Sequence, residues 1–158
     1  MQPKYVKKLC QLIEISQPGD TLIFYFSGHG NYDEEGHIHL VAADGSALYG
    51  YDFQASLDSM ADRVKATFII DSCYGGEFMV LAHHKVVLYA SSKQDEESTG
   101  GSLGSLFTNV FVNCVKQNLQ TTHQQLINQI QKKHSNHGGR PVANLIATPE
   151  TRNSIIFQ

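Results

Sequence analysis

The sequence predicts a three-layer α/β/α sandwich with a mostly parallel central sheet. Two apolar runs rich in β-branched and aromatic residues, 21–26 and 66–70, are typical of buried strands, and each follows a segment whose apolar residues recur at helical spacing. Alternation of strands and helices favours a parallel sheet covered on both faces. With 158 residues, 41% of them hydrophobic and 17% charged, the chain fits a single domain over residues 1–158.

The first half of the chain alternates between helix and strand signals. Apolar residues recur at helical spacing from Tyr5 to Ile15, and a Pro-Gly turn then ends this helix before the strand from Thr21 to Phe26. Further elements are predicted as a strand over residues 37–41, an amphipathic helix over 53–61 and a strand over 66–70.

The second half continues the alternation. A strand over residues 85–91 precedes a polar loop rich in Gly and Ser over 93–104, which is long enough to line a binding site. Helices are predicted over residues 106–115 and 122–133, a loop over 134–139 and a closing strand over 154–157.

Charge and cysteine content exclude several classes of function. The net charge of −3 and the lack of a long Lys/Arg cluster argue against nucleic acid or an acidic membrane as the main partner. No apolar run reaches a membrane-spanning length, and no signal-peptide core follows Met1. Three widely spaced cysteines form neither a disulfide framework nor a CxxC metal site, which predicts a reducing compartment, the cytoplasm. Cys10 and Cys114 fall on apolar helical stripes and are expected in the core.

Two of the predicted strands end in small residues that surround one reactive side chain. His29 follows the strand at 21–26, and Cys73 follows the strand at 66–70. Because neighbouring parallel strands end at the same edge of a sheet, we expect the imidazole and the thiol to meet in one crevice. An imidazole activates a cysteine nucleophile, and the backbone N–H groups of Gly30 and Cys73 could stabilise an oxyanion. The alternative is structural: a buried thiol and a turn histidine.

Other histidines and acidic residues give weaker signals. His37 and His39 share one face of a short strand and could bind zinc with His29, but no thiol or carboxylate is spaced to complete the site, so solvent-facing histidines are the preferred interpretation. The acidic run at 33–35 is interpreted as a solvated loop that could receive a basic substrate. Surface positions are predicted for the remaining histidine pairs: His83, His84, His134 and His137.

Several blocks of this sequence resemble the caspase-like cysteine peptidases (peptidase C14). Residues 18–30 are similar to the histidine block of that family, and Asp71-Ser72-Cys73 is similar to its cysteine block, closer to metacaspases and to bacterial and paracaspase-type members than to animal caspases. Residues 40–45, 91–98 and 106–108 are similar to further segments. The resemblance implies a caspase-like fold and a thiol protease, a hydrolase that uses a Cys73–His29 dyad without an obligatory third residue and without a cofactor.

The resemblance also implies substrate choice. Animal caspases, which cut after Asp, carry Gln where this chain has Asp71, whereas metacaspase-like members carry Asp facing a basic side chain. A carboxylate in a partly desolvated pocket favours Arg or Lys before the cleaved bond, and by the same resemblance Ser27 lines that pocket. Alternatively, Asp71 stabilises the N-terminus of the helix that follows it. Both roles can coexist.

The chain departs from the family pattern around the cysteine and in the calcium site. Metacaspases usually continue the cysteine block with His-Ser-Gly, whereas this chain has Tyr74-Gly75-Gly76. Asp44 matches one acid of the calcium-binding cluster of calcium-activated members, but the paired acids expected after it are missing, and Val80 lies near the position of another. We therefore expect no metal site and activity without calcium.

A larger departure lies at the start of the chain. Family members place a strand, a helix and a second strand ahead of the helix that precedes the histidine block, but here that helix begins close to Met1. The resemblance thus implies an N-terminally truncated sandwich in which one edge of the strand at 21–26 is exposed. We expect a second copy or a partner chain to cover this edge. A rival hypothesis is a non-catalytic caspase-like module that partners a full-length protease.

Overall fold

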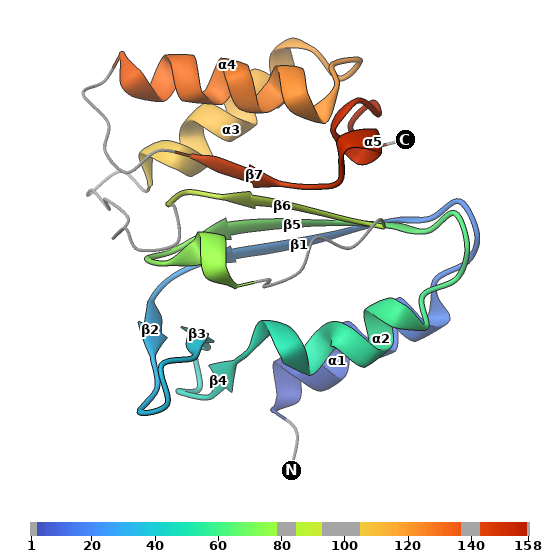
Figure 1. Ribbon diagram of the computed structural model, residues 1–158, viewed down its shortest axis with the longest axis vertical. Helices are drawn as coiled ribbons and strands as arrows, with labels where there is room; N and C mark the ends of the chain where they lie inside the picture. Colours follow the sequence, from blue (N-terminus) through green and yellow to red (C-terminus); the bar gives the residue numbers. More distant parts are fainter. Residues whose placement is uncertain (1–2, 79–84, 93–104, 137–142, 158) are drawn as a thin grey trace.

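The central sheet has four strands in the order β1-β5-β6-β7. The computed structural model describes residues 3–78, 85–92, 105–136 and 143–157. β1, β5 and β6 run parallel, and β7 pairs antiparallel with β6 (Figure 1). The strand bounds are β1 (Thr21–Ser27), β5 (Lys65–Asp71), β6 (Val86–Ala90) and β7 (Asn144–Ile146).

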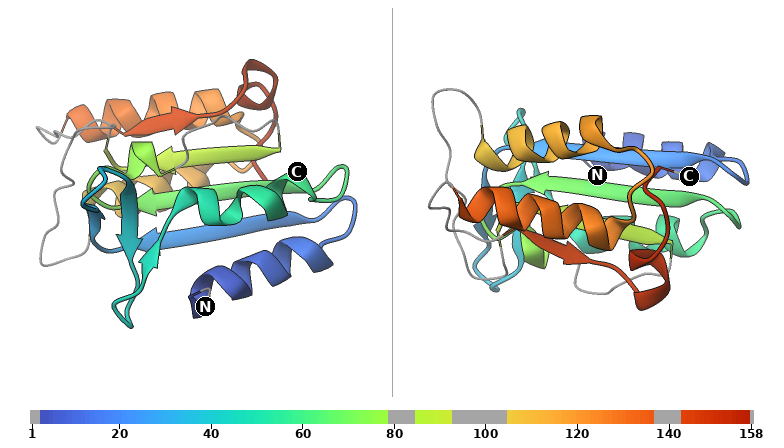
Figure 2. Two further views of the ribbon diagram at one scale, coloured as in Figure 1. Left: turned by 60° about the horizontal axis from the view of Figure 1, so that its bottom comes forward. Right: turned by 90° about the horizontal axis from the view of Figure 1, so that it is seen from above.

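Helices cover both faces of this sheet. One face carries the N-terminal helices and the other carries α3 and α4, as Figures 1 and 2 show. The predicted three-layer α/β/α architecture is confirmed. The helix bounds are α1 (Lys4–Ile15), η1 (Gly50–Phe53), α2 (Gln54–Asp58), η2 (Gly75–Glu77), α3 (Leu106–Gln117), α4 (His123–Ser135) and α5 (Pro149–Arg152).

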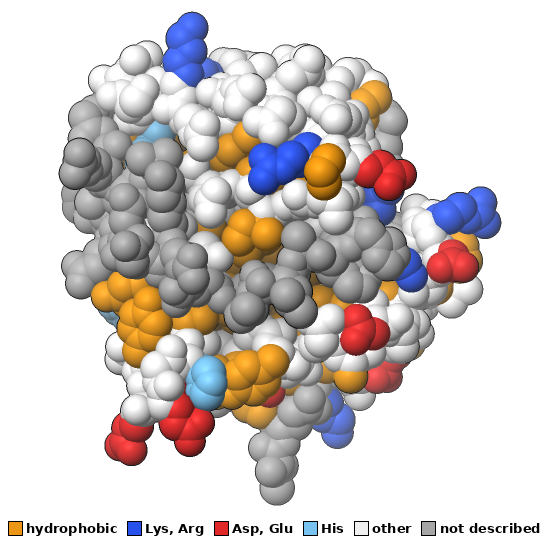
Figure 3. All heavy atoms as spheres, in the orientation of Figure 1, with side chains coloured by type: hydrophobic (Ala, Val, Ile, Leu, Met, Phe, Trp, Pro, Cys, Tyr) orange, Lys and Arg blue, Asp and Glu red, His pale blue; other side chains and the backbone are white. Residues whose placement is uncertain are grey.

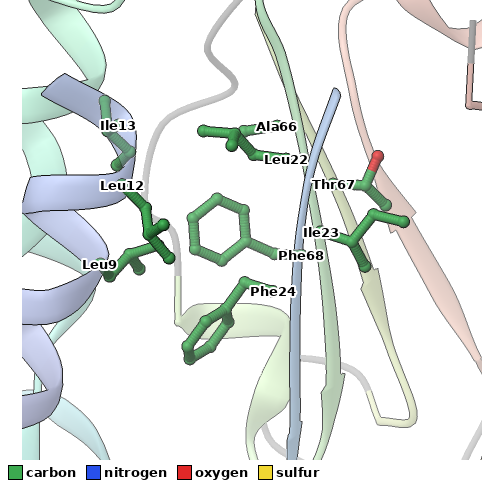
Figure 4. Close-up of a pocket in the computed structure, with 9 residues that line it drawn as sticks. All are labelled: Leu9, Leu12, Ile13, Leu22, Ile23, Phe24, Ala66, Thr67 and Phe68. Carbon is green, nitrogen blue, oxygen red and sulfur yellow. The ribbon is translucent and has the colours of Figure 1, made fainter. Parts of the chain in front are cut away.

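α1 packs against β1 through its apolar face, and the same apolar residues predict this helix from the sequence. Leu9 and Ile13 lie one helical turn apart and face the sheet, where Phe24 of β1 and Phe68 of β5 meet with ring centroids 5.3 Å apart (Figure 4). Ile23 points to the opposite face of the sheet, as strand alternation requires. This packing fixes the register of the strand that carries the histidine segment.

A smaller antiparallel sheet lies beyond the carboxyl end of β1 (Figure 1). Its turn is organised by Asp33, whose Oδ1 accepts the amides of Glu35 at 3.0 Å and His37 at 2.8 Å. These bonds, led by the one from His37, lower the pKa of the Asp33 carboxyl. The acidic run is therefore a hairpin turn. The strands are β2 (Gly30–Tyr32), β3 (Ile38–Val41) and β4 (Ala47–Leu48).

Two predicted elements differ in the structure. Residues 154–157 form a turn with one isolated bridge, Ile155 to Thr122, and the strand that closes the sheet is β7. Ile156 donates its amide to Thr121 at 3.1 Å and is buried beside α4, so its apolar character reflects core packing and not a ladder. The helix predicted over 53–61 begins as η1 and ends at Asp58.

The prediction that His134 lies on the surface is wrong. His134 belongs to α4 and is 3% exposed, because it continues the buried stripe of Ile127 and Ile130 at helical spacing. The predictions for His83, His84 and His137, and for the loop at 93–104, fall outside the described residues. Within the described ranges, no helix is long and apolar enough to cross a membrane.

The outer edge of β1 remains open to association. Among the described residues β1 pairs with β5 on one side and with no strand on the other, and Ile23 and Tyr25 are 57% and 50% exposed. Open strand edges with apolar side chains pair readily with other strands. We expect the purified protein to sediment as an assembly heavier than 17.5 kDa.

Charge at the edge should weaken this assembly. Ile23→Lys is expected to shift sedimentation toward the monomer, while the control Leu119→Lys, at an equally exposed apolar position between α3 and α4, leaves the assembly intact. A monodisperse wild-type monomer that unfolds cooperatively contradicts the expectation.

A buried histidine makes stability depend on pH. The Nδ1 of His123 lies 2.7 Å from the hydroxyl of Tyr89, and both side chains are buried between β6 and α4. Burial lowers the pKa of His123 to about 4, and burial also raises the pKa of Tyr89. The fold therefore favours the neutral imidazole.

The stability that this histidine contributes is present above pH 6.5 and is lost as the pH falls toward 4, where the folded protein also takes up the proton. The loss amounts to about 3 kcal/mol in the free energy of unfolding, measured by urea titration. His123→Gln should remove this part of the pH dependence, whereas His37→Gln, at an exposed position, should retain it. Identical pH profiles for wild type and His123→Gln contradict the assignment.

Candidate active site

The parallel pairing of β1 and β5 brings the two reactive segments to one edge. Ser27 aligns with Asp71 at the last paired position, and the amide of Gly28 donates to the carbonyl of Asp71 at 3.1 Å. His29 and Cys73 each lie two residues beyond this pair. The carboxyl ends of the two strands thus bring the histidine segment and the cysteine segment to the same edge of the sheet.

Gly30 lies directly against the cysteine segment. A Cβ atom added to Gly30 would lie 2.2 Å from the carbonyl oxygen of Cys73 and 3.3 Å from the hydroxyl of Ser72. No side chain fits at this approach, so the glycine is required by the cysteine backbone itself. The close approach of the Cys73 backbone is thus a structural reason for glycine at position 30.

The histidine is held by its backbone and presents its side chain to solvent. The carbonyl of His29 accepts the amide of Val41 at 2.9 Å, which ties it to β3. His29 is exposed and Cys73 is half-buried. A groove of 550 Å³ runs beside the histidine along β1, with Ser27 and Gly28 in its wall. The residues that line this groove include His29 but not Cys73.

Cys73 occupies a tight turn with unusual backbone geometry. The turn runs from Ser72 to Gly75, whose amide points at the carbonyl of Ser72 over 3.4 Å. Tyr74, at the third position, has φ 58° and ψ 16°, in the left-handed region where glycine or asparagine is usual. Its ring contacts that of Tyr32 in β2, with centroids 4.7 Å apart. The cysteine turn and the hairpin after the histidine thus contact each other.

Asp71, the last residue of β5, is 3% exposed, and its side chain contacts α3. Its Oδ2 accepts the hydroxyl of Thr108, in the first turn of α3, and Tyr25 Oη lies 3.0 Å from the same Thr108 oxygen. The helix that follows the cysteine is the three-residue η2, so the alternative role of Asp71 at a helix N-terminus applies to α3 instead. A negative charge near the first turn of a helix is stabilising.

The described residues contain no cluster of three or more metal-ligating side chains. His37 lies 3.4 Å from Asp33, and His39 packs on Tyr49, so neither joins His29 in a zinc site. Asp44 Oδ1 accepts the amide of Ser46 at 3.0 Å and its hydroxyl at 2.6 Å, which makes it a turn residue. Cys10 and Cys114 are buried, as their stripes predict.

Sequence reasoning missed the residues that support the site. Thr108 of α3 contacts Asp71, Tyr25 of β1 contacts Thr108, and Ser92, which follows β6, contacts the cysteine turn. Their proximity arises from tertiary packing, so no spacing along the chain indicates it. For Tyr74 the sequence does contain a signal: a bulky residue that is followed by two glycines after a strand suggests a strained turn.

The fold and this strand-end arrangement define a caspase-type domain, and comparisons with known proteins agree. The profile of the caspase domain family matches residues 4–153. The chain therefore belongs to the caspase domain family, whose members are cysteine peptidases.

Solved structures show the same fold at low sequence identity. A crystal structure of a protein from Geobacter sulfurreducens superposes with a TM-score of 0.75 at 18% identity, covering 98% of this chain and 77% of that one. Caspase-1 from Spodoptera frugiperda superposes with a TM-score of 0.69 at 12% identity, covering 91% of this chain and 65% of that one. Among curated protein sequences, none matches this chain.

Proposed function

We propose that this protein is a cysteine endopeptidase that hydrolyses peptide bonds after Arg or Lys, with Cys73 as the nucleophile and His29 as the general acid/base. The observation that carries the proposal is the pairing of Ser27 with Asp71 at the ends of β1 and β5, with Gly30 packed on the Cys73 carbonyl. A half-buried thiol and an exposed imidazole, which follow adjacent parallel strands, supply the two side chains that thiol catalysis needs and so support the proposal.

The chemistry proceeds in two steps. The Cys73 thiolate attacks the substrate carbonyl carbon, and His29 gives a proton to the leaving amine as the C–N bond breaks and a thioester remains. Water then attacks the thioester carbonyl carbon while His29 accepts its proton; the C–S bond breaks, the carboxylic acid product leaves, and the Cys73 thiolate is regenerated. The amides of Gly30 and Cys73 stabilise the oxyanion in both steps. No cofactor takes part.

Asp71 and Ser27 form the proposed pocket for a basic side chain. The burial of Asp71 supports this role, because a guanidinium or ammonium group that reaches a desolvated carboxylate gains a strong charge interaction. The Thr108 hydroxyl holds the carboxylate in one orientation. Ser27 is exposed at the strand end beside it.

Internally quenched peptides that differ only in the residue before the scissile bond test the proposal. We expect turnover with Arg or Lys and almost none with Asp, because two carboxylates in one pocket repel each other. Cleavage after Asp contradicts the pocket assignment. A complete lack of cleavage by the wild-type protein, with no labelling of Cys73 by an electrophilic Arg-ketone, contradicts the enzyme itself.

The open edge of β1 favours a second candidate, a non-catalytic caspase-like module that partners a full-length protease. The apolar side chains of Ile23 and Tyr25 at this edge support it. The peptide assay separates the two functions, since only the enzyme turns over substrate by itself.

Charge and free thiols bear on partners and compartment. Among the described residues on the face shown in Figure 3, Lys and Arg side chains are dispersed among neutral and acidic ones and form no basic patch, in keeping with a protein or peptide substrate. None of Cys10, Cys73 and Cys114 forms a disulfide, which supports our inference of a reducing compartment, the cytoplasm.

A further inference from the structure

A buried serine bridges the two ends of the cysteine turn. Ser92, which follows β6 and is 0% exposed, donates its hydroxyl to the carbonyl of Ser72 at 2.9 Å. The hydroxyl oxygen of Ser92 also accepts a hydrogen bond from the amide of Gly75 at 3.2 Å. One side chain from outside the turn therefore contacts the residue before Cys73 and the residue that closes the turn.

The turn needs such a bridge because its own geometry is weak. The direct contact from the Gly75 amide to the Ser72 carbonyl is 3.4 Å, well beyond the usual N–H···O distance of about 2.9 Å. Tyr74 also occupies a left-handed backbone conformation that a residue with a Cβ rarely adopts. Strained residues at functional sites persist only where the surrounding structure holds them.

We propose that Ser92 is a positioning residue that holds Cys73 in its reactive geometry by bridging the Ser72 carbonyl and the Gly75 amide. The proposal rests on the proposed function, in which Cys73 is the nucleophile. Ser92 acts through the backbone: it fixes the direction of the thiol and of the Cys73 amide assigned to the oxyanion hole. It touches neither substrate nor reacting atoms.

The neighbouring serine supplies a matched control. Ser91 is also buried, and its hydroxyl donates to the same Ser72 carbonyl at 3.3 Å. The bond from the Gly75 amide, by contrast, goes to Ser92. Ser91→Ala and Ser92→Ala thus delete equal volumes next to each other, but only Ser92→Ala opens the bridge.

The position of the substrate pocket predicts which kinetic constant changes. Asp71 lies before the turn, and its carboxylate accepts the hydroxyl of Thr108 in α3, a bond that does not belong to the bridge. Opening the bridge should therefore leave KM within about twofold. A displacement of about 1 Å at a reacting atom can lower the rate by about 10²-fold, so we expect a loss of that order in kcat for Ser92→Ala and a loss several-fold smaller for Ser91→Ala.

A double-mutant cycle with Tyr74→Gly tests the mechanism. Glycine adopts the left-handed conformation without strain, so in a Tyr74→Gly background the turn needs less external support. Tyr74→Gly alone loses the ring contact with Tyr32 and serves as the reference. We expect Ser92→Ala to cost less than about threefold in kcat in that background, against about 10²-fold in the wild type. A merely destabilising substitution would cost the same in both.

Alkylation of Cys73 by iodoacetamide, followed by mass spectrometry, keeps this proposal separate from the proposed function. If the wild-type protein cleaves no peptide, the enzyme assignment fails, but the alkylation rates still test the bridge. Slower labelling of Cys73 in Ser92→Ala than in Ser91→Ala supports the bridge, provided that adding Tyr74→Gly to Ser92→Ala restores the labelling rate. Equal kcat and equal alkylation rates in the two serine variants overturn the proposal, as does an undiminished effect of Ser92→Ala in the Tyr74→Gly background.

Discussion

Cys73→Ala is expected to abolish peptide hydrolysis, because no other described side chain at the carboxyl ends of β1 and β5 offers a thiol. Turnover of an Arg peptide should fall to the background of the assay, and the folded structure should persist, since Cys73 is half-buried at a strand end and outside both core clusters. Initial rates and circular dichroism spectra, recorded on the same samples, measure the two effects.

The other two cysteines supply the controls. Cys10→Ala and Cys114→Ala remove thiols that lie in the core, so turnover per folded molecule should stay close to that of the wild type. Assays well below the unfolding temperature keep any loss of core stability out of the comparison. Appreciable hydrolysis by Cys73→Ala is incompatible with the mechanism.

His29→Ala should cost several orders of magnitude in kcat. General acid/base catalysis alone contributes about 10²–10⁴-fold, and activation of the thiol by the imidazole is lost as well. The side chain is exposed and only its backbone is bonded to Val41, so removal of the ring should leave the fold intact. A loss of less than about tenfold would assign the proton transfer to another group.

Asp71→Asn should lower kcat/KM for Arg substrates by the equivalent of about 2–5 kcal/mol, the usual cost of truncating one partner of a buried charge pair. Asparagine has nearly the same shape and still accepts a hydrogen bond from the Thr108 hydroxyl, so the substitution removes the charge with little change in packing. Peptides with Arg and with an uncharged residue before the scissile bond, compared on both proteins, isolate that charge.

A second readout separates specificity from structure. Alkylation of Cys73 by a small uncharged reagent does not use the pocket and should proceed at nearly the wild-type rate in Asp71→Asn. If hydrolysis and alkylation slow by the same factor, Asp71 holds the cysteine segment and the first turn of α3 in shape, and the pocket assignment is wrong.

The sequence could predict the elements whose residues carry their own signal. β1, β5 and α1 have strong periodicity and lie within about one residue of the predicted bounds. β7 has three residues and no alternating pattern long enough to detect, and its position depends on pairing with β6. The apolar residues at 154–157 resemble a strand but fill the core beside α4.

In the candidate site, too, some features could be predicted from the sequence and others could not. His29 and Cys73 follow strand signals, so the placement of both segments at one edge of the sheet could be predicted from parallel topology. The contacts that support them could not, because Thr108 and Ser92 approach the site through packing across the sheet. For His134 the prediction failed for a different reason. Its polarity suggested a surface position, but it belongs to the buried stripe of α4 and lies in the core.

The most direct test of the account is to label the wild-type protein with an electrophilic Arg-ketone and to map the modified residue by mass spectrometry. The account predicts one rapid, saturable modification at Cys73, which is absent in Cys73→Ala, slowed by orders of magnitude in His29→Ala and weakened in apparent affinity in Asp71→Asn. Equal labelling of Cys10, Cys73 and Cys114, or labelling of Cys73 that is as fast without His29, would contradict a catalytic dyad at this edge of the sheet.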